Sequence, residues 1–587
     1  MTVDRRLWLV LMAAAAVMFY RLSHVDMAGD DAVYSARSIG LVDFMFTNPE
    51  YQSTPLQWFK EAPGWTHLSW HDHPLPLFLI QHVFLRAQES ILFAKLPYAL
   101  MALGTIFLTY LIWSFVPSGA DGRGGLPAEV RPGRTKAGAA TVGSPLVHNH
   151  TVGILSALFL VLNAHFIWAG RVAYMESGVL FFISLALYAL MLFLENKKRW
   201  WFFGIALGLA LTVKFSTAFI LPTIAAYVWL RDRSVYRDTR WWGALSVAAI
   251  LLLPVIIYNA AMYRATGHFS LQFVRLFHQQ SPWRLSGVQT NGLGRGFIEL
   301  MRNLGNLVSW PYWLLALTGA AWQTVQRRFS LPLMALFFLT IQQILIGQAG
   351  YLLTLYSIFL APIIAITLVD IAGYLKKHGY ARIRIPALAW LCAYGGFFVV
   401  NSHSLVHHIG SVGWAHSSAT SDNRGVLQLD WYLDHIVASD KTLTPFDPFS
   451  TVKIVDRRLH RYLISRPNAD IIKNLQHSRV ILIDGNISWF ARVWLMERRR
   501  FYDNTPIFTL NENKFLDQLH IEKMYYVAAT AYAPLDPSIN LNTRSEEMVA
   551  YLTEKKIAPL AEIRRDDGQV AFRVYEVDNQ RLKITGS

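Results

Sequence analysis

The stretch Gly29-Asp30-Asp31-Ala32-Val33-Tyr34 lies just after the first apolar segment of the chain, residues 7–20. Arg5 and Arg6 precede that segment, as expected of a retained signal-anchor helix. Positive charge ahead of a first span holds its start in the cytoplasm, so we expect the two acids on the outer face of the membrane. Charged side chains beside a bilayer are costly and tend to mark functional sites. The alternative for these acids is a helix cap or a solvated loop.

The composition indicates a membrane protein. Of the 587 residues, 53% are hydrophobic and only 16% are charged, which is more apolar surface than a soluble protein of this size needs. The net charge of +15 comes from basic residues in short loops between apolar segments, without a recognition motif, so it indicates topology rather than nucleic-acid binding. Cys392 is the single cysteine, so no intramolecular disulfide can form.

The alternation of apolar segments and basic loops predicts an all-α polytopic bundle of about eleven transmembrane helices within residues 1–401. The first outer loop is expected at about residues 21–74. Residues 75–90 are expected as a helix lying at the membrane interface, because polar side chains interrupt their apolar pattern. Counting the spans places the Asp30-Asp31 pair, Arg171, Glu176 and Lys214 on the same outer face.

A second domain is expected after the bundle, over residues 402–587. Short strands and intervening helices predict an extracytoplasmic α/β fold. The expected strands are residues 480–484, 524–528 and 571–577, and the expected helices are residues 430–436 and 543–556. The turn at residues 483–485 has no glycine-rich phosphate fingerprint, which speaks against nucleotide binding there.

Several charged or polar side chains have both a functional and a structural interpretation. Glu176 could be a site residue or simply the ion-pair partner of Arg171. Lys214 interrupts the apolar run of residues 207–221, either to bind an anion or to snorkel to the interface. The His-Asp-His sequence at 71–73 is not expected to bind a metal, because adjacent residues of an extended stretch point to opposite sides.

Six motifs, all in residues 5–400, together resemble the dolichyl-phosphate-mannose–protein mannosyltransferase superfamily. This GT-C-type group includes the bacterial lipid A aminoarabinose transferase. The motifs are Asp30-Asp31-Ala32-Val33-Tyr34, His73-Pro74-Leu75-Pro76-Leu77, Ala94-Lys95-Leu96-Pro97, the Arg171…Glu176 loop, the Gly208…Lys214 segment and the Tyr351…Pro362 segment. The chain departs from the family pattern in having Asp31 instead of Glu, and in Leu75, which separates two prolines. These departures leave the subfamily open.

The resemblance implies an inverting glycosyltransferase that moves a hexosyl or pentosyl group from a polyprenyl phosphate to a protein, lipid or glycan acceptor. It implies that Asp30 is the catalytic base and that Asp31 and Glu176 support it. It further implies that the donor phosphate is bound by Lys214, Arg171, Arg86 and Lys95. Expected substrate contacts are Tyr34, His73, His268, His278, Tyr351 and Tyr356, although the two loop histidines, His268 and His278, are more often interface residues.

The expected partners are the lipid-linked sugar, the acceptor and the bilayer, in protein glycosylation or in modification of lipopolysaccharide or the cell envelope. No cofactor is expected, because a phosphate leaving group carries less charge than a pyrophosphate and has less need of a divalent metal. The expected location is the plasma (inner) membrane, with a cytoplasmic N-terminus and a periplasmic C-terminal domain. The alternatives are a GT-C transferase with another donor, a glycan-binding sensor and a lipid-linked sugar flippase, although the chain shows no convincing internal repeat.

Overall fold

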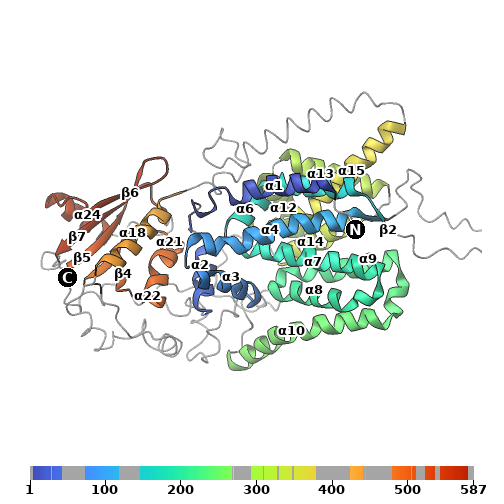
Figure 1. Ribbon diagram of the computed structural model, residues 1–587, viewed down its shortest axis with the longest axis horizontal. Coiled ribbons are helices and arrows are strands. Elements are labelled where there is room, and N and C mark those ends of the chain that lie inside the picture. Colours follow the sequence, from blue (N-terminus) through green and yellow to red (C-terminus); the bar gives the residue numbers. More distant parts are fainter. Residues whose placement is uncertain are drawn as a thin grey trace, which may run out of the picture.

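The computed structural model contains a body of long helices and a smaller domain with a β-sheet at one end (Figure 1). The described residues are 4–24, 26–27, 29–41, 73–117, 146–266, 269, 292–308, 310–326, 329–346, 350–377, 423–440, 443, 479–503, 505–510, 523–535 and 543–578. The start of the chain lies at the end of the helical body away from the sheet, as the N label in Figure 1 marks.

The helical body contains helices that are long and apolar enough to cross a bilayer. Five described segments meet this criterion, or up to six if a bent pair counts as one span. The five include α1 (Arg5–Phe19), α4 (Ile91–Ser114), α7 (Met175–Glu195), α10 (Thr239–Thr266) and α15 (Ser357–Lys377). The membrane-type helical bundle is therefore confirmed, whereas the predicted count of eleven is not.

Shorter helices fill the remainder of the described body. They are α5 (His150–Val161), α6 (Ala164–Arg171), α8 (Trp200–Val213), α9 (Ile220–Arg231), α12 (Gly292–Val308), α13 (Trp310–Val325) and α14 (Leu331–Ile346). Each is shorter than the ~20 residues that a straight span needs. The end of the predicted bundle, residues 378–401, lies outside the described residues.

Gly208, part of a family motif, has a packing role on α8. A Cβ atom added there would lie 2.7 Å from Leu251 Cδ1 of α10. Close approach of two helices over small residues is typical of membrane bundles. This contact brings α8 and α10 together and fixes the end of α8, where Lys214 follows as the C-cap.

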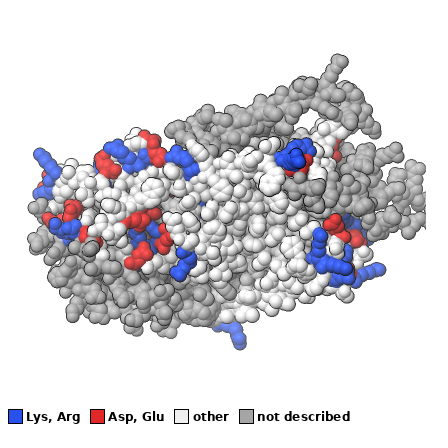
Figure 2. Space-filling view, in the orientation of Figure 1, with Lys and Arg blue, Asp and Glu red and all other residues white. Residues whose placement is uncertain are grey.

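Charged side chains gather over the two ends of the face shown in Figure 2, with few between them. The uncharged belt covers the helical body, as expected of a surface that faces lipid. Basic residues follow α7 at Lys197, Lys198 and Arg199, and follow α9 at Arg233 and Arg237. The cation of Lys197 is within electrostatic range of Asp232 and Asp238, so the loops after α7 and α9 are neighbours.

The C-terminal domain has a five-stranded sheet in the order β4-β3-β5-β7-β6. Strands β4 (Ile507–Thr509), β3 (Val480–Ile483) and β5 (Lys523–Ala529) are parallel, whereas β7 (Val570–Asp578) and β6 (Ala561–Arg564) add antiparallel pairs. Helices α18 (Val426–Ser439) and α24 (Thr543–Glu554) accompany the sheet. The predicted strands and helices of this domain are thus confirmed.

The two faces of this sheet belong to different hydrophobic clusters. Alternate residues of a strand point to opposite faces, and Val480 and Leu482 contribute to a cluster that also contains Met548 of α24. Ile481 and Ile483 contribute to a second cluster, which continues into α2 (Asp30–Gly40) of the helical body. The C-terminal domain therefore shares a core with the helix that begins at the paired acids.

The segment expected as the first outer loop contains this helix α2. It is followed, after residues 42–72 outside the described part, by α3 (Pro76–Ala87). α3 covers most of the expected interfacial helix, and its depth in a membrane stays a prediction. Both helices lie between the long helices and the C-terminal domain in Figure 1.

Candidate active site

The paired acids form the first turn of α2. Gly29 is the N-cap residue, and its N–H donates a hydrogen bond of 2.8 Å to Asp31 Oδ1. Carboxylates are stabilised at a helix N-terminus by the helix dipole. The helix-cap interpretation therefore holds for Asp31, which is 2% exposed. Asp30 is only partly covered, and is thus the more exposed of the two acids.

Glu176 and Lys214 form a buried ion pair beside this turn. Lys214 Nζ lies 2.5 Å from Glu176 Oε1, and each side chain is 2% exposed. The pair joins the start of α7 to the end of α8. Lys214 thus does not snorkel to an interface; its cation lies inside the helical body.

Arg171 does not form the ion pair with Glu176 that their closeness in the sequence indicates. Its Nη1 donates to the carbonyl oxygens of Val17, at 2.5 Å, and Met18, at 3.2 Å, near the end of α1. The interpretation of Glu176 as simply the partner of Arg171 is wrong, because Glu176 pairs with Lys214. The break between α6 and α7 separates the two side chains.

The electrostatic environment of Asp30 suits a general base. Burial, together with the negative charge of Glu176, raises the pKa of Asp30 to about 6, while Lys214 opposes the shift. Burial also raises the pKa of Asp31, against the opposing charge of Lys95. A carboxylate with a pKa near the working pH is ionised at neutral pH and still basic enough to accept a proton.

Lys95 completes the group that we call the acid–lysine cluster, namely Asp30, Asp31, Glu176, Lys95 and Lys214. Lys95 is fully buried on α4, and its Nζ donates to the backbone carbonyl of Asp26 at 3.3 Å. The structure thus brings together five of the predicted catalytic and phosphate-binding residues. Arg86, in contrast, is exposed in the last turn of α3.

Aromatic side chains surround the start of α2. The hydroxyl of Tyr34 and Nε2 of His73 lie 3.1 Å apart. Tyr356 is buried and its hydroxyl donates to Thr340 Oγ1 at 3.3 Å. The predicted His268 and His278, and the side chain of Tyr351, lie outside the described part of the chain.

Two residues that the sequence did not single out interact electrostatically with Asp30. Tyr174 places its hydroxyl 2.8 Å from the position of a Cβ atom on Gly29, and its ring lies against Trp168, at 5.0 Å between centroids. Arg37 is fully buried on α2, and its charge acts on Asp30. Arg37 follows Asp30 by seven residues, which is two helical turns, and this spacing was the available signal.

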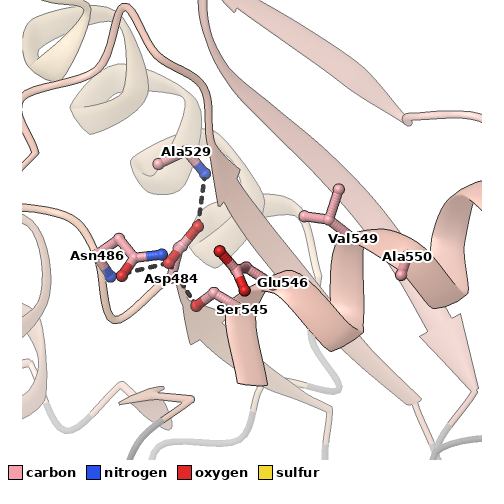
Figure 3. Close-up of a pocket in the computed structure, with 7 residues that line it drawn as sticks. All are labelled: Asp484, Asn486, Ala529, Ser545, Glu546, Val549 and Ala550. Carbon is pink, nitrogen blue, oxygen red and sulfur yellow. Dashed lines mark hydrogen bonds between the residues drawn. The ribbon is translucent and has the colours of Figure 1, made fainter. Parts of the chain in front are cut away.

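A metal site is not evident at this position: among the described residues, no group of three or more His, Cys, Asp or Glu side chains could hold a metal ion. A separate hollow of about 370 Å³ lies in the C-terminal domain, lined by Asp484, Asn486 and residues of α24 (Figure 3). There the Asp484 carboxylate accepts hydrogen bonds from Asn486 N–H, Ala529 N–H and Ser545 Oγ–H. Asp484 therefore fastens the loop after β3 to β5 and α24.

Three solved structures are similar to this chain at low sequence identity. ArnT from Cupriavidus metallidurans bound to undecaprenyl phosphate is 11% identical, with 100% of each chain covered and a TM-score of 0.49. The same protein in the apo state is 12% identical, with 97% of each chain covered and a TM-score of 0.45. Archaeal oligosaccharyltransferase AglB from Archaeoglobus fulgidus is 13% identical, covering 88% of this chain and 69% of that one, with a TM-score of 0.47.

Sequence comparison gives one family match. No curated protein matches the chain. A family model does match residues 141–272, which include Arg171, Glu176 and Lys214. The resemblance that the motifs predicted is thus confirmed over residues 141–272 by the model of the dolichyl-phosphate-mannose-protein mannosyltransferase family, whose members are glycosyltransferases.

Proposed function

We propose that this protein is an integral-membrane, inverting glycosyltransferase of GT-C type. The enzyme would move a sugar from a polyprenyl phosphate to the hydroxyl group of an acceptor substrate. The reaction would take place beside the first turn of α2. The observation that carries the proposal is the acid–lysine cluster, in which Asp30 lies within electrostatic range of both Glu176 and Lys214. The family match over residues 141–272 supports the same activity class.

The chemistry requires a base, and Asp30 is the proposed one. An acceptor hydroxyl is a poor nucleophile at neutral pH, so its proton must leave as its oxygen attacks the anomeric carbon. Asp30 accepts that proton. The bond between the anomeric carbon and the phosphate oxygen breaks, and the polyprenyl phosphate departs with the electron pair. Direct displacement inverts the configuration of the sugar.

Cations must stabilise the phosphate as it departs. We assign this role to Lys214 and Lys95, which the structure places at the cluster, and add Arg37 because its charge acts on Asp30. Arg171 holds α6 against the end of α1 through the carbonyl oxygens of Val17 and Met18. Its charge also acts on Lys95, and its predicted role at the phosphate stays a prediction. We propose that three nearby cations make a divalent metal unnecessary.

The proposed site lies on the extracytoplasmic face, with the C-terminal domain beside it. The contacts of α2 with that domain support a common side. The basic loops after α7 and α9 support a cytoplasmic location for the other end, in a plasma or inner membrane.

The substitution Asp30→Asn in the purified protein tests this function. Asparagine keeps the size of the side chain but does not accept a proton, so we expect transfer from a polyprenyl-phosphate sugar to fall by about 10²–10⁴-fold. The KM for the donor should change little. The measurement is single-turnover transfer from a panel of hexosyl and pentosyl polyprenyl phosphates.

Asp567→Asn, on an exposed turn of the C-terminal domain, is the matched control. Near-normal transfer by Asp30→Asn would refute its role as the base. If the unaltered protein uses no polyprenyl-phosphate sugar in the panel, the proposed donor class is wrong. Loss of transfer on addition of a chelator would instead favour a metal-dependent GT-C transferase with a different donor.

A further inference from the structure

Helix α2 cannot hold its position alone. It has only 11 residues, and isolated helices shorter than about 12–15 residues are marginal in water. The position of its first residues, Asp30 and Asp31, therefore depends on the side chains that pack against its two faces.

One face of α2 packs against the helical body. Ser38 Oγ donates to Gln81 Oε1 of α3 at 2.6 Å, and Gln81 Nε2 donates to Ser35 Oγ at 2.8 Å. Tyr34, one helical turn before Ser38, lies beside His73. These buried hydrogen bonds fix the rotation of α2 about its axis.

The opposite face of α2 packs against the C-terminal domain. Ala32, Val33 and Ala36 belong to the same hydrophobic cluster as Trp494 and Leu495. Leu85 and Ile91 of the helical body also belong to it. The α2 residues lie near the start of the sequence, and Trp494 and Leu495 lie near its end. This part of the cluster therefore forms only when the domain docks against α2.

Tyr502 of α22 (Arg498–Tyr502) closes the contact at the far end of α2. Its hydroxyl donates a hydrogen bond of 2.7 Å to the carbonyl oxygen of Ala36. Its ring lies so close to Gly40 that an added Cβ atom would be 2.3 Å from Tyr502 Cε1. Gly40 is therefore required by the docked ring rather than by its own backbone conformation.

Asp26 makes a second tie just before α2. Its carboxylate accepts hydrogen bonds from the N–H groups of Arg424, just before α18, and Leu427, in the first turn of α18. Its own carbonyl oxygen accepts the bond from Lys95 of the acid–lysine cluster. The domain thus holds the chain both immediately before the acids and at the end of their helix.

A buried arginine links the domain to the helical body as well. Arg498 donates to Glu89, in the turn between α3 and α4, at 3.0 Å, and to Asp430 of α18 at 3.0 Å. The Arg498 side chain is only 4% exposed. Buried charges of this kind need their partners in place, so the contact favours one docked arrangement over loose association.

We propose that the C-terminal domain is a positioning element for the active site. It acts through Tyr502, which bonds to Ala36 of α2, and through the backbone N–H groups of Arg424 and Leu427, which bond to Asp26 just before α2. The domain holds α2 so that Asp30 stays against Glu176 and Lys214. The catalytic part of this inference rests on the proposed glycosyltransferase function, whereas the docking of α2 does not.

Two substitutions in the full-length protein test the inference without removing a group from the cluster. Tyr502→Phe removes only the hydroxyl that bonds to Ala36, and Gly40→Ala forces the Tyr502 ring away from the helix. Tyr532→Phe, at an exposed tyrosine of the same domain, is the control with the same chemical change.

We expect faster hydrogen exchange at the amides of α2 in Tyr502→Phe and Gly40→Ala, but not in the control. We expect kcat to fall by about tenfold or more, with the donor KM within about twofold, because a displacement of 1 Å can cost about 10²-fold in rate. Gly40→Ala should have the larger effect, because it displaces the whole ring.

Unchanged exchange in both variants would overturn the docking role. Faster exchange with unchanged kcat would show that the domain holds α2 without positioning the acids, and would overturn the catalytic part. If the unaltered protein shows no transfer, the proposed function fails, and the exchange rates still decide whether the domain holds α2.

Discussion

Glu176 and Lys214 control the proton affinity of Asp30, and this control can be measured. Burial and the charge of Glu176 raise the pKa of Asp30 to about 6, and Lys214 lowers it. Because the base must be ionised, kcat/KM should rise with pH up to about 6 and level off above it. Glu176→Gln removes the repulsion and keeps the positive charge of Lys214, so the rise should move to lower pH. The measurement is kcat/KM between pH 4.5 and about 8.

Glu195→Gln, at the exposed end of the same helix, is the control for this shift. A rise that stays in place or moves to higher pH in Glu176→Gln contradicts the assignment of Asp30 as the titrating base. The loss of a buried ion-pair partner should also lower the free energy of unfolding by about 3–5 kcal/mol, so a thermal melt should accompany the kinetic measurement.

Sequence motifs predicted all five residues of the acid–lysine cluster. They did not predict that Glu176 pairs with Lys214. Arg171 is only five positions from Glu176 in the chain, whereas Lys214 is thirty-eight positions away, so Arg171 was the more obvious partner. The break after α6 decides the outcome by directing Arg171 to the end of α1. Tyr174 was missed for a related reason: a tyrosine at the start of an apolar segment resembles an interfacial anchor.

Asp484 joins three elements of the C-terminal domain, and its loss should weaken them together. Its carboxylate accepts hydrogen bonds from two backbone N–H groups and from the Ser545 hydroxyl. Asp484→Ala leaves the buried Ser545 hydroxyl and two partly buried N–H groups without this acceptor, at about 1–3 kcal/mol for the buried group. We therefore expect faster hydrogen exchange in β5 and α24 and a lower melting temperature of the domain.

Glu546→Ala is the comparison for Asp484→Ala, because Glu546 lines the same hollow but is exposed. A surface substitution of this kind should stay within about 0.5 kcal/mol. Equal effects of the two substitutions would mean that Asp484 does not fasten these elements.

Helix α2 is one element that the sequence did not predict. Asp30 and Asp31 after Gly29 are a recognisable helix start, but the helix is short and neither face reads as simply exposed. Its apolar residues Ala32, Val33 and Ala36 share a cluster with Trp494 and Leu495 of the C-terminal domain, which are far from α2 in the sequence. The hydrophobic periodicity of a segment carries no information about such a distant partner. The strands of the sheet, in contrast, could be predicted from the residue pattern of each strand alone.

At the scale of the whole molecule, the sequence predicted a helical membrane body followed by an α/β domain, and the structure has both. The count of about eleven spans is not confirmed by the described residues, which hold five or six candidates. Several apolar segments fold as helices of 12 to 16 residues, such as α9 and α14, and hydropathy alone does not distinguish a short helix from a span. Packing between helices decides which segments bend or stop.

The charge at the two ends of the molecule predicts its orientation in the membrane. The basic loop after α7 should be cytoplasmic, and the C-terminal domain should be on the other side. The single Cys392 can be replaced by alanine to give a cysteine-free background. Lys198→Cys and Glu554→Cys then place one exposed thiol in the loop and one in the domain. In cells with an intact plasma membrane, an impermeant thiol reagent should label only Glu554→Cys. Labelling of Lys198→Cys alone would reverse the orientation, and labelling of both would mean that the loop and the domain share a side.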